Sequence, residues 1–139
     1  MIKFGAPGSM VHDYVHWSVL LRPKQVTLGS LVLVAKERAT AWPMLGAAAF
    51  EELKAITADI EQALRQSFDH DKINYLMLMM VDPDVHFHVI PRYCTSRTFH
   101  GVEFFDPGWP GPPRLDSAAE TGEIVNNSLR DQLVRSWHD

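Results

Sequence analysis

Two short apolar runs near the start of the chain predict a pair of strands. Residues 14–21 are rich in β-branched and aromatic side chains, and residues 30–36 are almost continuously apolar. Such composition over so short a length is typical of strands rather than helices. The Arg-Pro-Lys sequence and a glycine that lie between the runs favour a turn. We therefore expect a β-hairpin here.

The pattern changes between residues 43 and 69, where apolar side chains recur at steps of three and four. These residues are Phe50, Leu53, Ile56, Ile60, Leu64 and Phe68, with charged residues between them. This spacing places the apolar side chains on one side of a helix. The segment therefore predicts a long amphipathic helix.

Two more strands are expected after this helix, at residues 73–81 and 85–90, joined antiparallel through a tight Asp-Pro-Asp turn. The Pro- and Gly-rich segment at 106–113 predicts a loop, in which we expect Trp109 to anchor the loop rather than stack on a base. Ser117 and Glu120 have the spacing of a capping box, which predicts a C-terminal helix at about 117–137.

The element order indicates an α+β domain with helices packed on an antiparallel sheet. We expect a single domain over residues 1–139, with its core at about 14–93.

Composition narrows the possible functions. The chain is 46% hydrophobic and 22% charged, as in ordinary globular proteins, and its net charge of −4 argues against a protein that coats duplex nucleic acid. Cys94 is the single cysteine, so no internal disulfide can form. The apolar run at 75–81 is too short to cross a bilayer. We expect a cytoplasmic protein with no membrane partner.

The strand at 85–90 carries the candidate chemistry. Because side chains alternate on a strand, Asp84, His86 and His88 share one face while Val85, Phe87 and Val89 point into the core. The two imidazoles would then lie roughly 6 to 7 Å apart on an exposed face, within reach of one phosphate. A neutral imidazole can attack phosphorus, and a neighbouring imidazolium can stabilise charge.

Two other interpretations of these histidines remain open. They are consistent with a pair of hydrogen-bonded core residues that have no chemical role. They are also consistent with a zinc or iron site that uses Asp84, His86 and His88 as ligands.

The segment "DVHFHVIPR", residues 84–92, resembles the signature of the histidine triad (HIT) family of nucleotide hydrolases and transferases. In that signature three histidines alternate with apolar residues and are often followed by Pro-Arg. The segment "WSVLLRPKQVTLGSLVLVAKE", residues 17–37, is similar to the nucleotide-binding hairpin of the family. A long helix and a strand then follow in the family's order. The resemblance covers the chain from Trp17 to about Tyr93.

The resemblance implies a homodimer with an antiparallel sheet of about five strands, a long central helix and a C-terminal helix. It implies cleavage at the α-phosphate of a purine nucleotide, with no cofactor or metal required. His86 matches the nucleophile that forms a covalent nucleotidyl intermediate, and His88 matches the histidine that contacts the phosphate. Asp84 stands where the family has its first histidine, as a third catalytic residue that orients an imidazole. Family substrates include diadenosine polyphosphates and nucleoside phosphoramidates.

Four residues are expected to contact the nucleotide. Arg22 stands where the family often has the acidic or amide residue that holds the ribose, and Ser30 stands where a histidine follows the glycine. Arg92 lies just beyond the histidines, which suits contact with a phosphate or a solvated strand end, and Asn74 stands at the start of the strand at 73–81, which suits contact with a ribose or a turn cap. The Gly-Gln-Ser/Thr loop that often precedes the triad is absent from this chain.

These departures from the family pattern leave a second function open, that of a nucleotide-binding protein with weak or no turnover. A metal-binding site made of Asp84, His86 and His88 is the third alternative.

Overall fold

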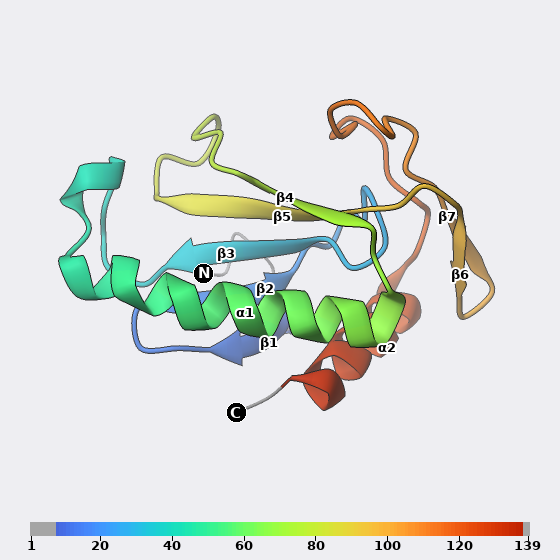
Figure 1. Ribbon diagram of the computed structural model, residues 1–139, viewed down its shortest axis with the longest axis horizontal. Helices are drawn as coiled ribbons and strands as arrows, with labels where there is room; N and C mark the ends of the chain where they lie inside the picture. The colour runs from blue at the N-terminus through green and yellow to red at the C-terminus, as the bar shows by residue number, and fades with distance from the viewer. Residues whose placement is uncertain (1–7, 138–139) are drawn as a thin grey trace.

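The computed structural model describes residues 8–137, and its main element is a five-stranded antiparallel sheet with the strand order β1-β2-β3-β5-β4 (Figure 1). The strands are β1 (Met10–Asp13), β2 (Trp17–Leu21), β3 (Leu31–Ala35), β4 (Lys72–Leu76) and β5 (His86–Arg92). The expected hairpin is confirmed, because β2 pairs with β3 through the turn between them. The antiparallel pairing of β4 with β5 is confirmed as well.

Two helices complete the α+β fold. The long helix α1 (Ala47–Phe68) runs across one face of the sheet, preceded by the short 3-10 helix η2 (Trp42–Met44) (Figure 1). The C-terminal helix α2 (Glu123–Ser136) packs beside the end of α1, where the hydroxyls of Ser67 and Ser136 are 2.8 Å apart. The predicted long helix and C-terminal helix are thus both present. No helix within residues 8–137 has the length and apolar content to span a membrane.

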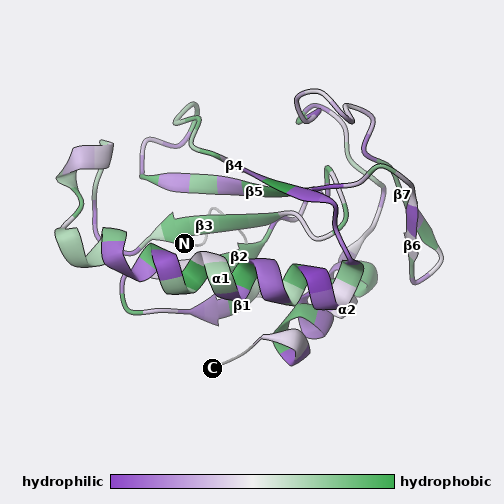
Figure 2. Cartoon of the chain, in the orientation of Figure 1, coloured by the Kyte–Doolittle hydropathy of each residue, from purple (hydrophilic) through white to green (hydrophobic). Residues whose placement is uncertain are grey.

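The main core lies between α1 and the sheet. Ile56, Ile60 and Leu64 of α1 are fully buried, as the three- and four-residue spacing predicts. They belong to one apolar cluster with alternate residues of the strands, including Val19, Leu33 and Val89. Figure 2 shows β3 hydrophobic along its length, whereas β5 alternates between hydrophobic and hydrophilic residues. One face of β5 is therefore available for polar side chains.

Gly29 fixes the β2–β3 hairpin against the end of α1. Its backbone has φ +86°, a conformation that glycine adopts without strain. A Cβ atom at this position would lie 2.9 Å from the Leu64 side chain and 3.0 Å from that of Phe68. The hairpin approaches the helix this closely because residue 29 has no side chain.

The connection between β4 and β5 differs from the prediction. The strand expected at 73–81 ends at Leu76, and residues 77–85 form a longer connection instead of a tight turn. Met79 has φ 51°, and Asp82 Oδ1 accepts a hydrogen bond from the backbone N–H of Asp84. A left-handed residue and an Asx-type turn both interrupt the regular strand conformation.

The predicted start of the C-terminal helix is also wrong. The helix begins at Glu123 after Gly122, so Ser117 and Glu120 form no capping box. The reason is visible at Ala119, whose backbone N–H donates to the carbonyl of Gln25. This bond holds the segment against the β2–β3 turn in a non-helical conformation.

Three short strands were not predicted from the sequence. β1 pairs with β2, and β6 (Arg97–Phe99) and β7 (Val102–Phe104) form a separate hairpin. Residues 14–16, at the start of the first expected strand, lie outside β2. The ends of the predicted domain, residues 1–7 and 138–139, lie outside the described residues.

Candidate functional site

His86 and His88 lie on the face of β5 that is turned away from α1. Their cross-strand partners, Val34 and Val32, belong to a small apolar cluster with Leu20 that is separate from the main core. The two imidazole centroids are 5.2 Å apart and the ring planes make an angle of 79°. On the opposite face Val85 and Val89 are fully buried, and Phe87 packs against the main core. The predicted division of this segment between two faces therefore holds for these residues.

His86 has a defined orientation. Its Nδ1 atom is 2.7 Å from the backbone carbonyl oxygen of Asp84. A carbonyl only accepts hydrogen bonds, so Nδ1 carries the proton and a neutral His86 has its lone pair on Nε2. His86 is only 4% exposed, which corrects the expectation of an exposed face.

His88 is partly buried, and its Nδ1 atom is enclosed without a hydrogen-bond partner in the described part of the chain. Burial lowers the pKa of His88 to about 4, and the electrostatic effects of Arg22 and His86 act in the same direction. His88 is therefore neutral at pH 7. A neutral imidazole can contact a phosphate as a hydrogen-bond donor but supplies no positive charge.

Arg22 supplies a positive charge close to His88. It follows β2 directly, where its backbone N–H donates to the carbonyl of Ser30, and the strand register places it on the same face as His88. Its Nη1 donates to the Lys24 carbonyl at 2.8 Å. Within residues 8–137 no carboxylate forms an ion pair with Arg22. Burial lowers the pKa of this half-buried guanidinium, which would be better solvated beside an anion.

Asp84 lies just before β5, so strand alternation does not place its side chain. Its backbone carbonyl contacts His86, and its backbone N–H donates to Asp82. The orienting contact to His86 is thus made by the main chain, which any residue at position 84 can supply. A catalytic role for the Asp84 carboxylate still rests on the resemblance.

Arg92 and Asn74 form a different kind of site, at the other end of β5. The Arg92 guanidinium forms a bidentate ion pair with Asp106 at 2.7 and 3.1 Å, and it also donates to Asn74 Oδ1 at 2.8 Å. The Arg92 and Asp106 side chains are 4% and 0% exposed. Asp106 was missed by the sequence analysis, in which the Asp-Pro-Gly sequence indicated only a loop. These contacts link β4 and β5 to the loop that follows β7.

Ser30 is fully buried in the turn between β2 and β3. Its hydroxyl donates to the carbonyl of Thr27 and accepts from the backbone N–H of Thr27. Of the seven predicted site residues, the structure brings His86, His88 and Arg22 onto one face, with the Asp84 main chain beside them. Ser30, Asn74 and Arg92 have internal partners. The assignment of Ser30 to the nucleotide rests on the resemblance, and that of Asn74 and Arg92 rests on their positions in the sequence.

The described residues contain no cluster of three histidine, cysteine, aspartate or glutamate side chains with the geometry of a metal site. Asp84, His86 and His88 therefore do not form a preformed ligand set within this part of the chain.

Comparison with solved structures assigns the fold. A histidine triad protein from Marinobacter aquaeolei is 20% identical, with a TM-score of 0.73 over 99% of this chain and 96% of the other. A histidine triad protein from Bradyrhizobium japonicum is 19% identical, with a TM-score of 0.72 over 93% of this chain and 90% of the other. The chain has the histidine triad fold.

A zinc-bound histidine triad family protein from Mycobacterium smegmatis has the same fold, with a TM-score of 0.62 and 17% identity over 96% of this chain and 89% of the other. No protein-family model and no curated protein matches the sequence. The three solved structures thus share this fold at identities of 20% or less.

Proposed function

We propose that the chain is a nucleotide hydrolase or nucleotidyl transferase that acts at the α-phosphate through a covalent nucleotidyl-His86. The observation that carries this proposal is the contact of His86 Nδ1 with the Asp84 carbonyl at 2.7 Å. This contact keeps the lone pair of the neutral ring on Nε2 and fixes the direction of attack. An oriented, neutral imidazole is the form in which histidine acts as a nucleophile.

The chemistry follows in two steps. His86 Nε2 forms a bond to phosphorus while the P–O or P–N bond to the leaving group breaks, and the leaving group departs with the electron pair and takes up a proton from solvent. A water oxygen then forms a bond to phosphorus while the bond between phosphorus and His86 Nε2 breaks, which releases a nucleoside monophosphate and a proton and restores the imidazole. A transferase would use another acceptor in place of water. No metal or cofactor takes part in either step.

His88 and Arg22 both contact the phosphate in this mechanism, one as a neutral hydrogen-bond donor and the other as a cation. The neutral His88 ring offers a single N–H donor, and Arg22 offers a cation that lies on the same face and pairs with no carboxylate within residues 8–137. Guanidinium groups bind phosphate oxygens well because several N–H donors lie in one plane. This arrangement supports a phosphate ligand, and we assign it to the purine nucleotide class that includes diadenosine polyphosphates and phosphoramidates.

A nucleotide-binding protein with weak turnover is the second candidate. Its support is Asp84, whose carboxylate stands at the position of the family's first histidine and would repel a phosphate if ionised. The two candidates differ in whether a covalent intermediate forms.

Single-turnover trapping separates the two candidates. The protein is mixed with a diadenosine polyphosphate labelled at the α-phosphate and then denatured under alkaline conditions, in which phosphoramidate bonds survive. We expect label on the wild type and none on a His86→Ala variant. His100→Ala, at an exposed turn outside the site, serves as the matched control and should carry label like the wild type.

Two results would contradict the covalent mechanism. Label on His86→Ala equal to that on the wild type would exclude His86 as the nucleophile. Nucleotide binding to the wild type without any label would favour the binding protein.

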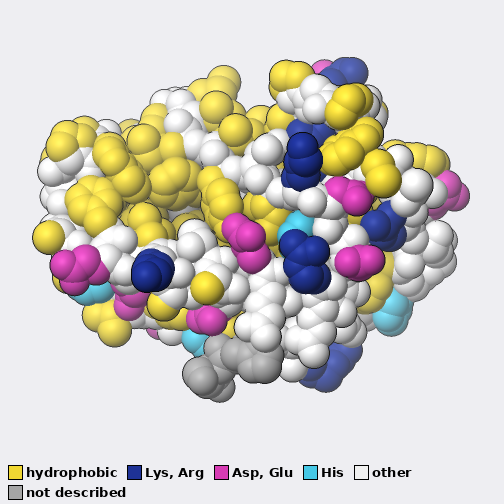
Figure 3. Space-filling view, viewed as in Figure 1, with side chains coloured by type: hydrophobic (Ala, Val, Ile, Leu, Met, Phe, Trp, Pro, Cys, Tyr) yellow, Lys and Arg dark blue, Asp and Glu magenta, His cyan; other side chains and the backbone are white. Residues whose placement is uncertain are grey.

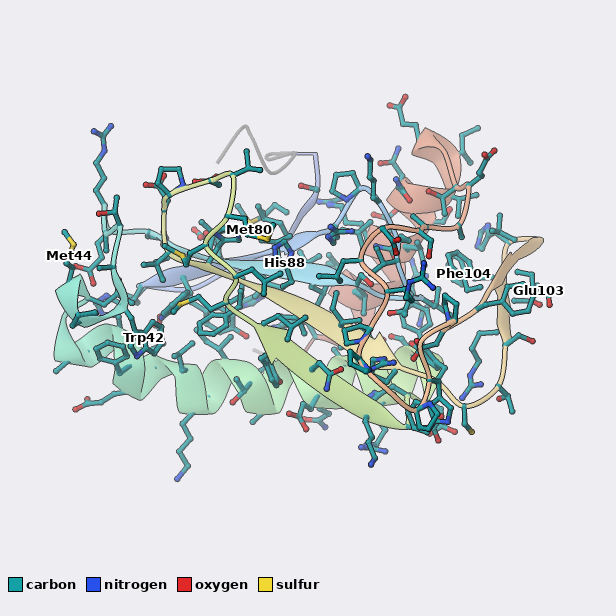
Figure 4. The ribbon with its side chains drawn as sticks, turned by 90° about the horizontal axis from the view of Figure 1, so that it is seen from above. Trp42, Met44, Met80, His88, Glu103 and Phe104 are labelled. Atoms are coloured by element: carbon teal, nitrogen blue, oxygen red, sulfur yellow. The ribbon has the colours of Figure 1, made fainter. Side chains whose placement is uncertain are left out.

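We also propose that the chain forms a homodimer. β4 is an edge strand of the sheet, and edge strands carry backbone groups that can pair with another chain. Figure 3 shows hydrophobic side chains gathered at one end of the molecule, and Figure 4 shows Met44 and Met80. Both are exposed, as are Leu78 and Val81, which are close to Met80 in the sequence. An apolar patch of this kind is typical of a protein–protein contact.

Light scattering at micromolar concentration tests the dimer. We expect twice the monomer mass for the wild type and a lower mass for the double variant Leu78→Lys, Met80→Lys. A wild type of monomer mass would contradict the proposal.

A further inference from the structure

A pocket lies at the end of β5 opposite to His86. It has a volume of about 450 Å³ and is bounded by the start of β4, the end of β5 and the loop after β7. Its walls are Lys72, Asn74, Arg92 and the loop segment Trp109–Pro112. In Figure 1 this loop, drawn in orange, rises beside the ends of β4 and β5. The chemistry assigned to His86 does not use this pocket.

The pocket wall that contains Trp109 is held in place by buried polar contacts. Asp106 accepts both guanidinium bonds from Arg92 and a third bond from the backbone N–H of Tyr93. The Trp109 backbone N–H donates to the Asp106 carbonyl, and the Arg92 guanidinium carbon lies 6.0 Å from the centre of the indole. The loop thus positions a partly buried tryptophan before any ligand arrives, which reduces the entropy cost of binding.

The groups that line this pocket suit a flat aromatic ring attached to an anion. The Trp109 indole offers an apolar face. Asn74 accepts from Arg92 through Oδ1, so its amide N–H groups remain as donors. The charge of Arg92 is balanced by Asp106, whereas the exposed Lys72 forms no ion pair within the described residues. The net charge of the pocket lining is therefore positive.

The pocket and the histidines share one face of the sheet. Arg92 lies six residues beyond His86 on β5, a distance of roughly 20 Å along a strand and with the same side-chain direction. Asn74 lies opposite Ile90, between these two positions. An extended ligand in which a chain of several phosphates joins two nucleosides has a comparable length from the attacked phosphorus to its second base.

We infer that the pocket beside Trp109 binds the aromatic base of the leaving group, so that the ligand is a dinucleotide with one phosphate at His86 and its second base on Trp109. This inference rests on the proposed function, because it assumes that a nucleotide phosphate lies at His86. It adds a second base site and predicts a preference for two-ended ligands over mononucleotides.

Calorimetric titration tests the second base site. The wild type and variants are titrated with AMP and with a diadenosine tetraphosphate whose bridging oxygens next to the α-phosphates are replaced by methylene groups. Stacking of one base on an aromatic side chain contributes about 1 to 3 kcal/mol. Trp109→Leu should therefore weaken dinucleotide binding by at least about fivefold and leave AMP binding unchanged, whereas Trp109→Phe should retain most of the affinity.

Lys72→Met provides an independent variant, because Lys72 is exposed and forms no ion pair within the described residues. It should weaken dinucleotide binding and make that binding less dependent on salt. Lys54→Met, at an exposed position on α1, is the matched control and should behave like the wild type.

The titrations distinguish failure of the second base site from failure of the proposed function. If AMP binds but neither Trp109→Leu nor Lys72→Met weakens the dinucleotide, the second base site is wrong and the proposed function stands. Equal loss of both ligands in these variants also overturns the second base site. Failure of the wild type to bind either ligand overturns the proposed function, and the second base site with it.

Discussion

Measuring the pKa of His88 tests directly how burial and the neighbouring Arg22 and His86 act on this imidazole. Burial, Arg22 and His86 together lower that pKa to about 4 from an ordinary value of about 6.5. Replacing Arg22 with methionine removes a charge at nearly constant length. We expect the pKa of His88 to rise in this variant but to remain below its ordinary value, because burial is the larger cause and persists.

The same shift predicts how stability depends on pH. The unfolded chain binds a proton at His88 more readily than the folded chain, so this contribution to stability is complete above pH 6.5 and is lost as the pH falls through 4. The difference between the two pKa values gives a loss of about 2 kcal/mol between pH 7.5 and pH 5, and about 3 kcal/mol at lower pH.

Two measurements check this prediction. NMR of the imidazole nitrogens follows the pKa of each histidine, and urea denaturation at pH 5 and 7.5 follows the free energy of unfolding. A His88→Gln variant should lose less stability on acidification than the wild type. The pKa of His70 is also lowered by burial, so His70 contributes to the pH dependence of stability in both proteins. The difference between the wild type and His88→Gln therefore reports His88 alone. Arg38→Met, at an exposed position, controls for the loss of an arginine.

The reasoning would be refuted by a His88 that titrates near pH 6.5 in the wild type. It would also be refuted by an Arg22→Met variant in which the pKa of His88 does not change.

Three further predictions concern stability and are measured by urea denaturation. Gly29→Ala should cost about 1 to 3 kcal/mol, because the new Cβ lies 2.9 Å from Leu64 and φ is +86°. Tyr14→Phe should cost about 1 to 3 kcal/mol, because the lost hydroxyl donates to Asp59 and accepts from the Trp137 indole. Asp106→Ala should cost about 3 to 5 kcal/mol, because it leaves the buried Arg92 charge without its carboxylate. A loss below about 0.5 kcal/mol would contradict each prediction.

The strongly periodic parts of the sequence were the easiest to predict. The apolar spacing of Ile56, Ile60 and Leu64 defines α1, and the apolar runs define the β2–β3 hairpin. Short elements were missed because they carry too few residues to show a period. β6 and β7 have three residues each, and their turn at His100 and Gly101 needs positive φ values of 49° and 76°. The capping-box prediction failed because a tertiary bond from Ala119 to Gln25 outweighs the local preference.

The candidate site was predictable in its residue types but not in its contacts. The alternation of side chains along a strand is enough to predict that His86 and His88 share one face, and the structure has them there. No sequence pattern indicates that the Asp84 carbonyl, as opposed to its carboxylate, contacts His86. The pairing of Arg92 with Asp106 joins residues 14 positions apart across the β6–β7 hairpin, a contact that depends on how this hairpin folds back. Burial of His86 and His88 likewise depends on neighbouring strands.

The position of β5 in the sheet explains how one strand can serve both proposed sites. β5 pairs with β3 on one side and β4 on the other, so its backbone is held by two ladders. Side chains at its two ends are then fixed relative to each other by a rigid segment, with His86 at the start and Arg92 at the end. The groups that complete each end come from the connections, the Asp84 carbonyl before the strand and Asp106 after it. The strand therefore determines the distance between the two sites. The adjoining loops determine which ring nitrogen of His86 carries the proton and where Trp109 lies.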